Sequence, residues 1–119
     1  MLDLFEDPRC WIQDDYGRDH QIWRGHTVEI SCWCLAGAAR EVALGSVYAE
    51  VMEEKPVERW GRLISALYEA LSPYHQKQAN GEGAWLAKQR AVIAFNDVPS
   101  RQIGEIRAVI TKALEAETA

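Results

Sequence analysis

The chain has 119 residues, of which 48% are hydrophobic, and its formal net charge at pH 7 is −5. A chain of this length and composition is expected to form a single domain, residues 1–119, around one core. The negative charge argues against nucleic acid as a partner, because general nucleic-acid binding neutralises phosphates with basic residues. The sequence has no run of 18 apolar residues and no basic, apolar leader. We therefore expect a cytoplasmic protein without a membrane span.

The first thirty residues contain the weakest helical signals. Pro8 and Gly25 interrupt any helical period, and residues 14–19 (DDYGRD) have the composition of a turn. The segments on either side of that turn, residues 10–13 and 20–23, are short, aromatic and β-branched, which favours a β-hairpin between them. We expect a short N-terminal hairpin or irregular segment that lies on a helical core.

From about Ser31 the apolar residues recur with a period of 3.6, which is typical of helices. Ser31 is a candidate N-cap of the first helix, and Gly45 is a candidate stop at its C-terminal end. The other predicted helices are residues 56–71, 84–95 and 100–117, with a short helical piece at 46–54 and a polar loop at 74–83. The predicted fold is mainly α, with about four principal helices in one core.

One group of side chains suggests a metal site. His20, His26, Cys32 and Cys34 supply two imidazoles and two thiols, which are typical ligands of tetrahedral zinc. If residues 32–34 lie in the helix, however, the two cysteines point to nearly opposite sides and cannot reach one ion. We therefore expect no cofactor, and a zinc-stabilised binding domain is kept as an alternative. The two thiols are also too close for an unstrained disulfide, which indicates reduced cysteines.

Cys34 is also the candidate nucleophile. It lies in the first turn of the predicted helix, where the helix dipole lowers the pKa of a thiol. A catalytic thiol needs a base, and no local motif connects Cys34 to His20, His26 or His75. Because cysteines on alanine-rich helices usually pack as small apolar residues, we expect Cys34 to be buried. A small enzyme that uses Cys34 with a histidine is an alternative.

The segment FNDVPSR at residues 95–101 is predicted to join the last two helices. Asn96 is expected to close the preceding helix in the left-handed conformation, and Asp97 or Ser100 is expected to cap the next one. This interpretation needs no catalysis, and we favour it.

The same segment also has a functional interpretation. Asp97 and Arg101 could lie beside Trp11 and Gln13 in a shared polar pocket. In that pocket Arg101 would bind a carboxylate or a phosphate through two hydrogen bonds. A small enzyme built on Asp97 and Arg101 is therefore a further alternative.

Five tryptophans are more than a domain of this size is expected to bury completely. An exposed indole is typical of an interface, and Trp23 and Trp60 each stand next to an arginine. We therefore expect these two to lie on the surface and to bind a protein partner or a second copy of the chain.

Two strings resemble those of a known family: WCLAGA at residues 33–38 and FNDVPSR at residues 95–101. Together with Trp11 and Gln13, their order and spacing resemble the small uncharacterised bacterial and phage proteins of family DUF6197. The family's Thr-x-x-Glu capping box is replaced here by QIGE at residues 102–105. That family has no established activity, so the resemblance implies a fold without a mechanism. The function expected from the sequence is a small, phage-related interaction module, and whether it is also an enzyme is left open.

Overall fold

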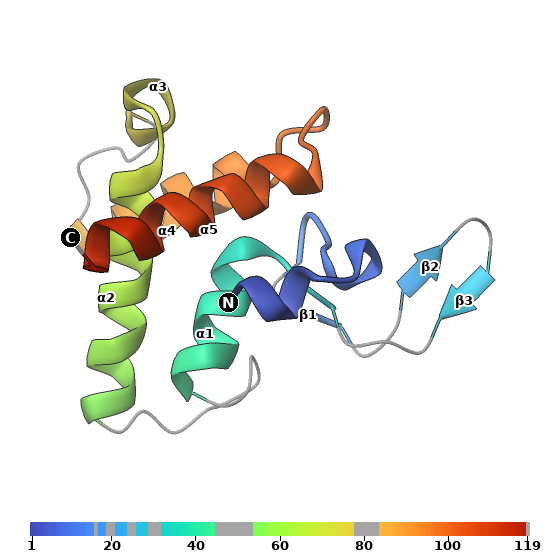
Figure 1. Cartoon of the computed structure of the whole chain (residues 1–119), viewed down its shortest axis with the longest axis horizontal. Coiled ribbons are helices and arrows are strands. Elements are labelled where there is room, and N and C mark those ends of the chain that lie inside the picture. The colour runs from blue at the N-terminus through green and yellow to red at the C-terminus, as the bar shows by residue number, and fades with distance from the viewer. Residues whose placement is uncertain are drawn as a thin grey trace.

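Four α-helices of ten residues or more make up most of the part of the chain that the computed structural model describes (Figure 1). That part comprises residues 1–15, 17–18, 21–23, 26–28, 32–44, 54–77 and 84–118. Its helices are α1 (Leu35–Leu44), α2 (Glu54–Ala70), α3 (Pro73–Gln76), α4 (Ala84–Asn96) and α5 (Ile103–Thr118). The predicted fold class, mainly α with about four principal helices and a short N-terminal β element, is confirmed.

The N-terminal part is irregular by comparison. Two 3-10 helices, Leu2–Phe5 and Pro8–Cys10, come before four short strands. The strands are β1 (Gly17–Arg18), β2 (Gln21–Trp23), β3 (His26–Val28) and β4 (Cys32–Trp33). Antiparallel pairing joins β1 to β4 and β2 to β3. The β2–β3 pair extends away from the helices in Figure 1.

The prediction of a hairpin between residues 10–13 and 20–23 is wrong. Residues 20–23 do contain a strand, β2, but its partner is β3 rather than residues 10–13. Trp11 instead forms a parallel bridge with Trp33, and the backbone N–H of Ile12 donates to the Trp33 carbonyl oxygen at 3.1 Å. The backbone groups of residues 11 and 12 are therefore used in contact with β4, a pairing that local sequence cannot reveal.

The core is built around α2, which contacts α1, α4 and α5. Ile64 and Leu67, one turn apart on α2, are almost completely buried, as their shared helical face predicts. The N-terminal segment closes this core: Phe5 is fully buried, and Arg107 of α5 donates to its carbonyl oxygen at 3.1 Å. The other large, almost fully buried apolar side chains of the helices are Leu35, Val92, Ile106 and Ile110.

The helix boundaries differ from the prediction in several places; α2, for example, begins at Glu54 instead of residue 56, and α5 begins at Ile103 instead of residue 100. Helix α1 begins at Leu35 instead of near Ser31, and α3 occupies a stretch that was predicted as loop. Pro73 explains α3, because proline is favoured in the first turn of a helix, where its missing N–H costs nothing. Ser31, Gly45 and residues 46–53 lie outside the described residues, as does the loop at 80–83. Among the described helices, none has the length and apolar character needed to cross a membrane.

Candidate functional site

Asn96, the last residue of α4, is fully buried and connects three segments of the chain. Its Oδ1 atom accepts hydrogen bonds from the indole N–H of Trp11 at 2.7 Å and from the backbone N–H of Leu35 at 2.9 Å. Its Nδ2 atom donates to the Ile12 carbonyl and to Asp97 Oδ1, both at 3.0 Å. The N-terminal segment, the start of α1 and the end of α4 are thus fixed to one another through one amide.

Gln13 strengthens this junction. Its side-chain Nε2 donates to the carbonyl oxygens of Asn96 at 2.9 Å and Val98 at 2.7 Å. The last carbonyls of a helix have no partner within the helix, so Gln13 supplies part of what the end of α4 lacks. The two sequence elements that contain Trp11 and Asn96 therefore meet in the fold and hold it together.

The caps predicted for this junction are wrong. Asn96 is not in the left-handed conformation, because Asp14 is the one described non-glycine residue with a positive φ. Neither Asp97 nor Ser100 caps α5. Instead Glu105 accepts the backbone N–H of Gln102 at 2.9 Å, which is one half of a capping box. Asp97 is used differently: its Oδ1 atom accepts the backbone N–H of Asp14 at 2.9 Å.

Arg101 is not among the residues that line the pocket containing Asp97. Its Nε donates to the Phe95 carbonyl at 2.8 Å, its Nη1 lies 2.6 Å from Glu105 Oε2, and its guanidinium stacks 3.9 Å from the centre of the Phe95 ring. The side chain is only 8% exposed. Arg101 thus connects the end of α4 to the start of α5 and stabilises the turn between them. Its predicted role in ligand binding stays a prediction.

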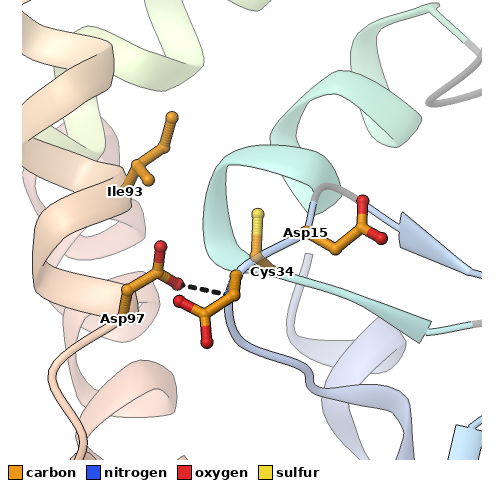
Figure 2. A pocket seen from close by; sticks show the side chains of 5 residues that line it. Asp15, Cys34, Ile93 and Asp97 are labelled. Atoms are coloured by element: carbon orange, nitrogen blue, oxygen red, sulfur yellow. Dashed lines mark hydrogen bonds between the residues drawn. The ribbon is translucent and has the colours of Figure 1, made fainter.

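A cavity of about 360 Å³ lies beside the junction, lined by Asp14, Asp15, Cys34, Ile93 and Asp97. Figure 2 shows Ile93 and Asp97 on the side of α4, across the pocket from Cys34 and Asp15. The residues at the mouth are acidic, since Asp14 and Asp15 are exposed, and the inner wall is apolar. Three of the five lining residues are therefore aspartates, although the carboxylate of Asp15 points away from that of Asp97 in Figure 2.

The backbone at Asp14 helps to shape this pocket. Asp14 has a φ of 64°, which non-glycine residues seldom adopt, although aspartate tolerates it better than most. The hydrogen bond from its N–H to Asp97 holds the bend against the end of α4. Asp97 is held in turn by Asn96, so the buried amide also positions one wall of the pocket.

Cys34 is buried as predicted, with only 3% of its surface exposed. It immediately precedes α1, and its Sγ atom accepts the backbone N–H of Gly37 at 3.2 Å, as a capping side chain does. Burial raises the pKa of the thiol to about 11; the Gly37 hydrogen bond opposes this shift and the charge of Asp97 adds to it. At pH 7 only about one Cys34 in ten thousand is therefore a thiolate.

His75 is not placed to activate Cys34. Its ring contacts the rings of Phe95 and Tyr74, with centroids 5.0 and 5.2 Å apart, and it does not line the pocket that contains Cys34. Burial, followed by the charge of Arg101, lowers the pKa of His75. His20 lies outside the described residues, and only the backbone of His26 is described.

The described residues contain no group of three or more histidine, cysteine, aspartate or glutamate side chains that could hold a metal ion. Of the four ligands of the zinc alternative, Cys32 lies buried in β4 and Cys34 lies just before α1, so the helical geometry that we used as an argument against zinc does not apply to them. All three cysteines of the chain are unbridged.

Trp60 was expected on the surface, and this expectation is wrong. Its side chain is only 8% exposed, because Trp60 shares the inner face of α2 with Ile64 and Leu67. The guanidinium of Arg40, 5.1 Å from the ring centre, lies over it. The side chain of Trp23, in β2, is outside what the structure describes.

Three pocket residues were missed by the sequence analysis: Asp14, Asp15 and Ile93. The available signal was the pair of aspartates directly after the Trp-x-Gln element, which we interpreted only as a turn. Ile93 gave no signal of its own, because it lies on a helix with apolar residues on several sides.

The family model of DUF6197, described as a family of unknown function, matches residues 1–116, so the chain belongs to this family. The resemblance noted from its motifs is therefore confirmed. Neither a curated protein nor a solved structure matches the chain.

Proposed function

We propose that this member of the family is a small interaction module, and that its acidic pocket holds a basic side chain of a protein partner. The observation that carries the proposal is the cavity of about 360 Å³ with Asp14, Asp15 and Asp97 around it. A lysine or arginine side chain has the charge that this arrangement attracts.

Electrostatics favours a cation at this position. Asp14, Asp15 and Asp97 all line this pocket, and their negative charges attract a positive group that enters it. The net charge of −5 acts in the same direction over a longer range and would speed the approach of a basic partner.

The shape of the pocket adds a preference for a long basic side chain. Ile93 and Cys34 offer an apolar wall for the methylene stem, while the aspartates stand where the charged end would lie. Arginine suits such a site best, because its planar guanidinium can donate two hydrogen bonds to one carboxylate.

The pocket supports the enzyme alternatives less well. A nucleophilic Cys34 would have to lose its proton, and its pKa of about 11 opposes this at neutral pH. The combination of Asp97 with Arg101 is not assembled, because Arg101 bonds to Phe95 and Glu105 instead. A cytoplasmic location is part of the proposal and is supported by the unbridged cysteines. The relationship to phages stays a prediction from the family resemblance.

The test is a titration of the ¹⁵N-labelled protein with acetyl-arginine amide, with the uncharged acetyl-glutamine amide as the reference ligand. We expect saturable shifts of the backbone signals of residues 14, 15, 34 and 97 with the arginine compound alone. Asp15→Asn should weaken the binding at least about tenfold, because it removes one of three charges. Glu58→Gln, an equal change of charge at an exposed position of α2, should alter it less than about twofold.

Two results would contradict the proposal. One is the absence of localised shifts at millimolar arginine compound. The other is an equal effect of Asp15→Asn and Glu58→Gln, which would show that only the overall charge of the protein matters.

A further inference from the structure

A second hollow, formed by other residues than the acidic pocket, lies between α2 and α5. Its volume is about 230 Å³. Figure 1 shows α5 crossing α2. The lining residues are Ala66, Glu69 and Ala70 of α2 and Lys112, Ala113 and Ala116 of α5.

The two walls of this α2/α5 groove carry opposite charges. Glu69 on α2 and Lys112 on α5 are both exposed, and the surface between them is made of alanines. The outer face of α5 has the same character, because Ala108 and Ala116 stand one turn on either side of Lys112 and are also exposed. A groove and a helix that could fill it thus occur on the same surface.

We propose that two copies of the chain pair through this groove, with α5 of each copy lying in the groove of the other. Lys112 of each copy then faces Glu69 of the second copy, and the alanines let the two helices approach closely. The charges support this occupant: a two-fold axis brings each lysine to a glutamate, so the surface is complementary to itself.

The alanines and the ion pairs have different roles in this dimer. An exposed ion pair contributes little free energy, so the affinity comes from burying the groove and the outer face of α5. The two Glu69–Lys112 pairs set the register and oppose other pairings. A dimer of this kind is weak and is weakened further by salt.

This proposal does not depend on the acidic pocket, because the two sites share no lining residue. A protein that binds the arginine compound as a monomer would overturn the dimer and leave the proposed function standing. A protein that forms the dimer but does not bind the arginine compound would overturn the proposed function and leave the dimer standing.

The test is sedimentation equilibrium of the full chain from about 5 μM to about 1 mM. We expect a monomer–dimer equilibrium for the natural protein and at least about tenfold weaker pairing for Glu69→Lys and for Lys112→Glu, since each places like charges together. An equimolar mixture of these two variants should pair again to within about threefold of the natural protein, because each copy then offers the charge that the other lacks. Glu58→Lys, at an exposed position of α2 outside the groove, is the matched control and should change the pairing less than about twofold.

Ala116→Arg provides a second test that does not use ion pairs. Ala116 is exposed in the single chain, so the monomer can accommodate the larger side chain, while the groove is blocked. Loss of the dimer in this variant supports the proposal. A natural protein that is monomeric at about 1 mM overturns it, and so does a dimer that all these substitutions leave unchanged. Failure of the two charge variants to pair in the mixture overturns the Glu69–Lys112 contact.

Discussion

The indole N–H of Trp11 donates to Oδ1 of Asn96 at 2.7 Å, although 85 residues separate the two in the sequence. The same oxygen accepts the backbone N–H of Leu35, the first residue of α1. A buried amide whose polar atoms are all hydrogen-bonded contributes strongly to stability, because loss of the amide leaves several buried partners without a hydrogen bond. Asn96 is thus a central point of attachment between the N-terminal segment and the helices, together with Gln13 and the contact of Arg107 with Phe5.

Asn96→Ala should therefore destabilise the protein strongly. It leaves the Trp11 indole, the Leu35 N–H and the Ile12 carbonyl without their partner. Each such group costs about 1–3 kcal/mol, and with partial relaxation we expect a total loss of about 2–5 kcal/mol in the free energy of unfolding. Urea unfolding at pH 7 measures it.

Gln102→Ala is the matched control for Asn96→Ala. It also removes an amide side chain, but an exposed one, and should change the free energy of unfolding by less than about 0.5 kcal/mol. Equal effects of the two substitutions would show that Asn96 is not the central contact of this junction.

Cys34 should make the stability of the protein depend on pH in the alkaline range. Its pKa rises on folding from 9.0 to about 11, because burial favours the neutral thiol. The stability that this contributes is fully present below pH 9 and is lost as the pH rises through about 11. The limiting loss is about 2–3 kcal/mol, since one pKa unit corresponds to about 1.4 kcal/mol.

This prediction is checked with chemical unfolding between pH 8 and pH 10.5 for the natural protein and for Cys34→Ala. The natural protein should lose more stability than the variant over this pH range. Subtracting the loss of the variant from that of the natural protein removes the contributions of tyrosine and lysine titration, which the two proteins share. Cys10→Ala is the control, because Cys10 is only half-buried and should contribute less. Rapid alkylation of native Cys34 at neutral pH would contradict the buried, protonated thiol.

His75 should respond in opposite directions to the loss of its two charged neighbours. Arg101 lowers the pKa of His75 and Glu105 raises it, while burial is the largest cause of the decrease. Arg101→Met is therefore expected to raise this pKa, and Glu105→Gln is expected to lower it further. Proton NMR titration of the imidazole signals measures both, with Arg101→Lys as the control that retains the charge. A shift in the same direction for both substitutions would show that altered packing, rather than charge, controls His75.

Much of the helical structure could be predicted from the sequence, because it follows from local periodicity. The buried face of α2, with Ile64 and Leu67, repeats every three to four residues and needs no partner to be recognised. The same reasoning assigns Trp60 to that face. We nevertheless expected Trp60 to be exposed, because its neighbour in the sequence, Arg59, is charged. The contact of Arg40 with the Trp60 ring shows that an arginine can lie over a buried indole, so a nearby arginine does not indicate that a tryptophan is exposed.

The pocket could not be predicted, because it depends on contacts between distant parts of the chain. Trp11 bridges Trp33 instead of pairing with a strand next to it in sequence, and this brings the bend after Gln13 to the end of α4. The positive φ of Asp14 has no signature that distinguishes it from an ordinary turn aspartate. Only the possible meeting of Asp97 with Trp11 and Gln13 was foreseen, and then only as the alternative that we did not favour.

Asp14 allows the stability of the bend to be separated from the charge of the pocket. At a φ of 64° glycine is unstrained, whereas alanine is penalised by its Cβ atom. Asp14→Gly should therefore be about 1 kcal/mol more stable than Asp14→Ala in urea unfolding. Both variants remove the same carboxylate and should bind acetyl-arginine amide equally weakly, at least about tenfold less tightly than the natural protein.

Asp14→Asn completes this series, because asparagine tolerates a positive φ and lacks the charge. It should keep the stability of the bend and lose the binding. If binding followed stability across the three variants, so that glycine or asparagine restored it, then the shape of the bend rather than the carboxylate of Asp14 would recognise the ligand. If glycine and alanine gave equal stability, the left-handed backbone at Asp14 would not be the conformation that the protein adopts in solution.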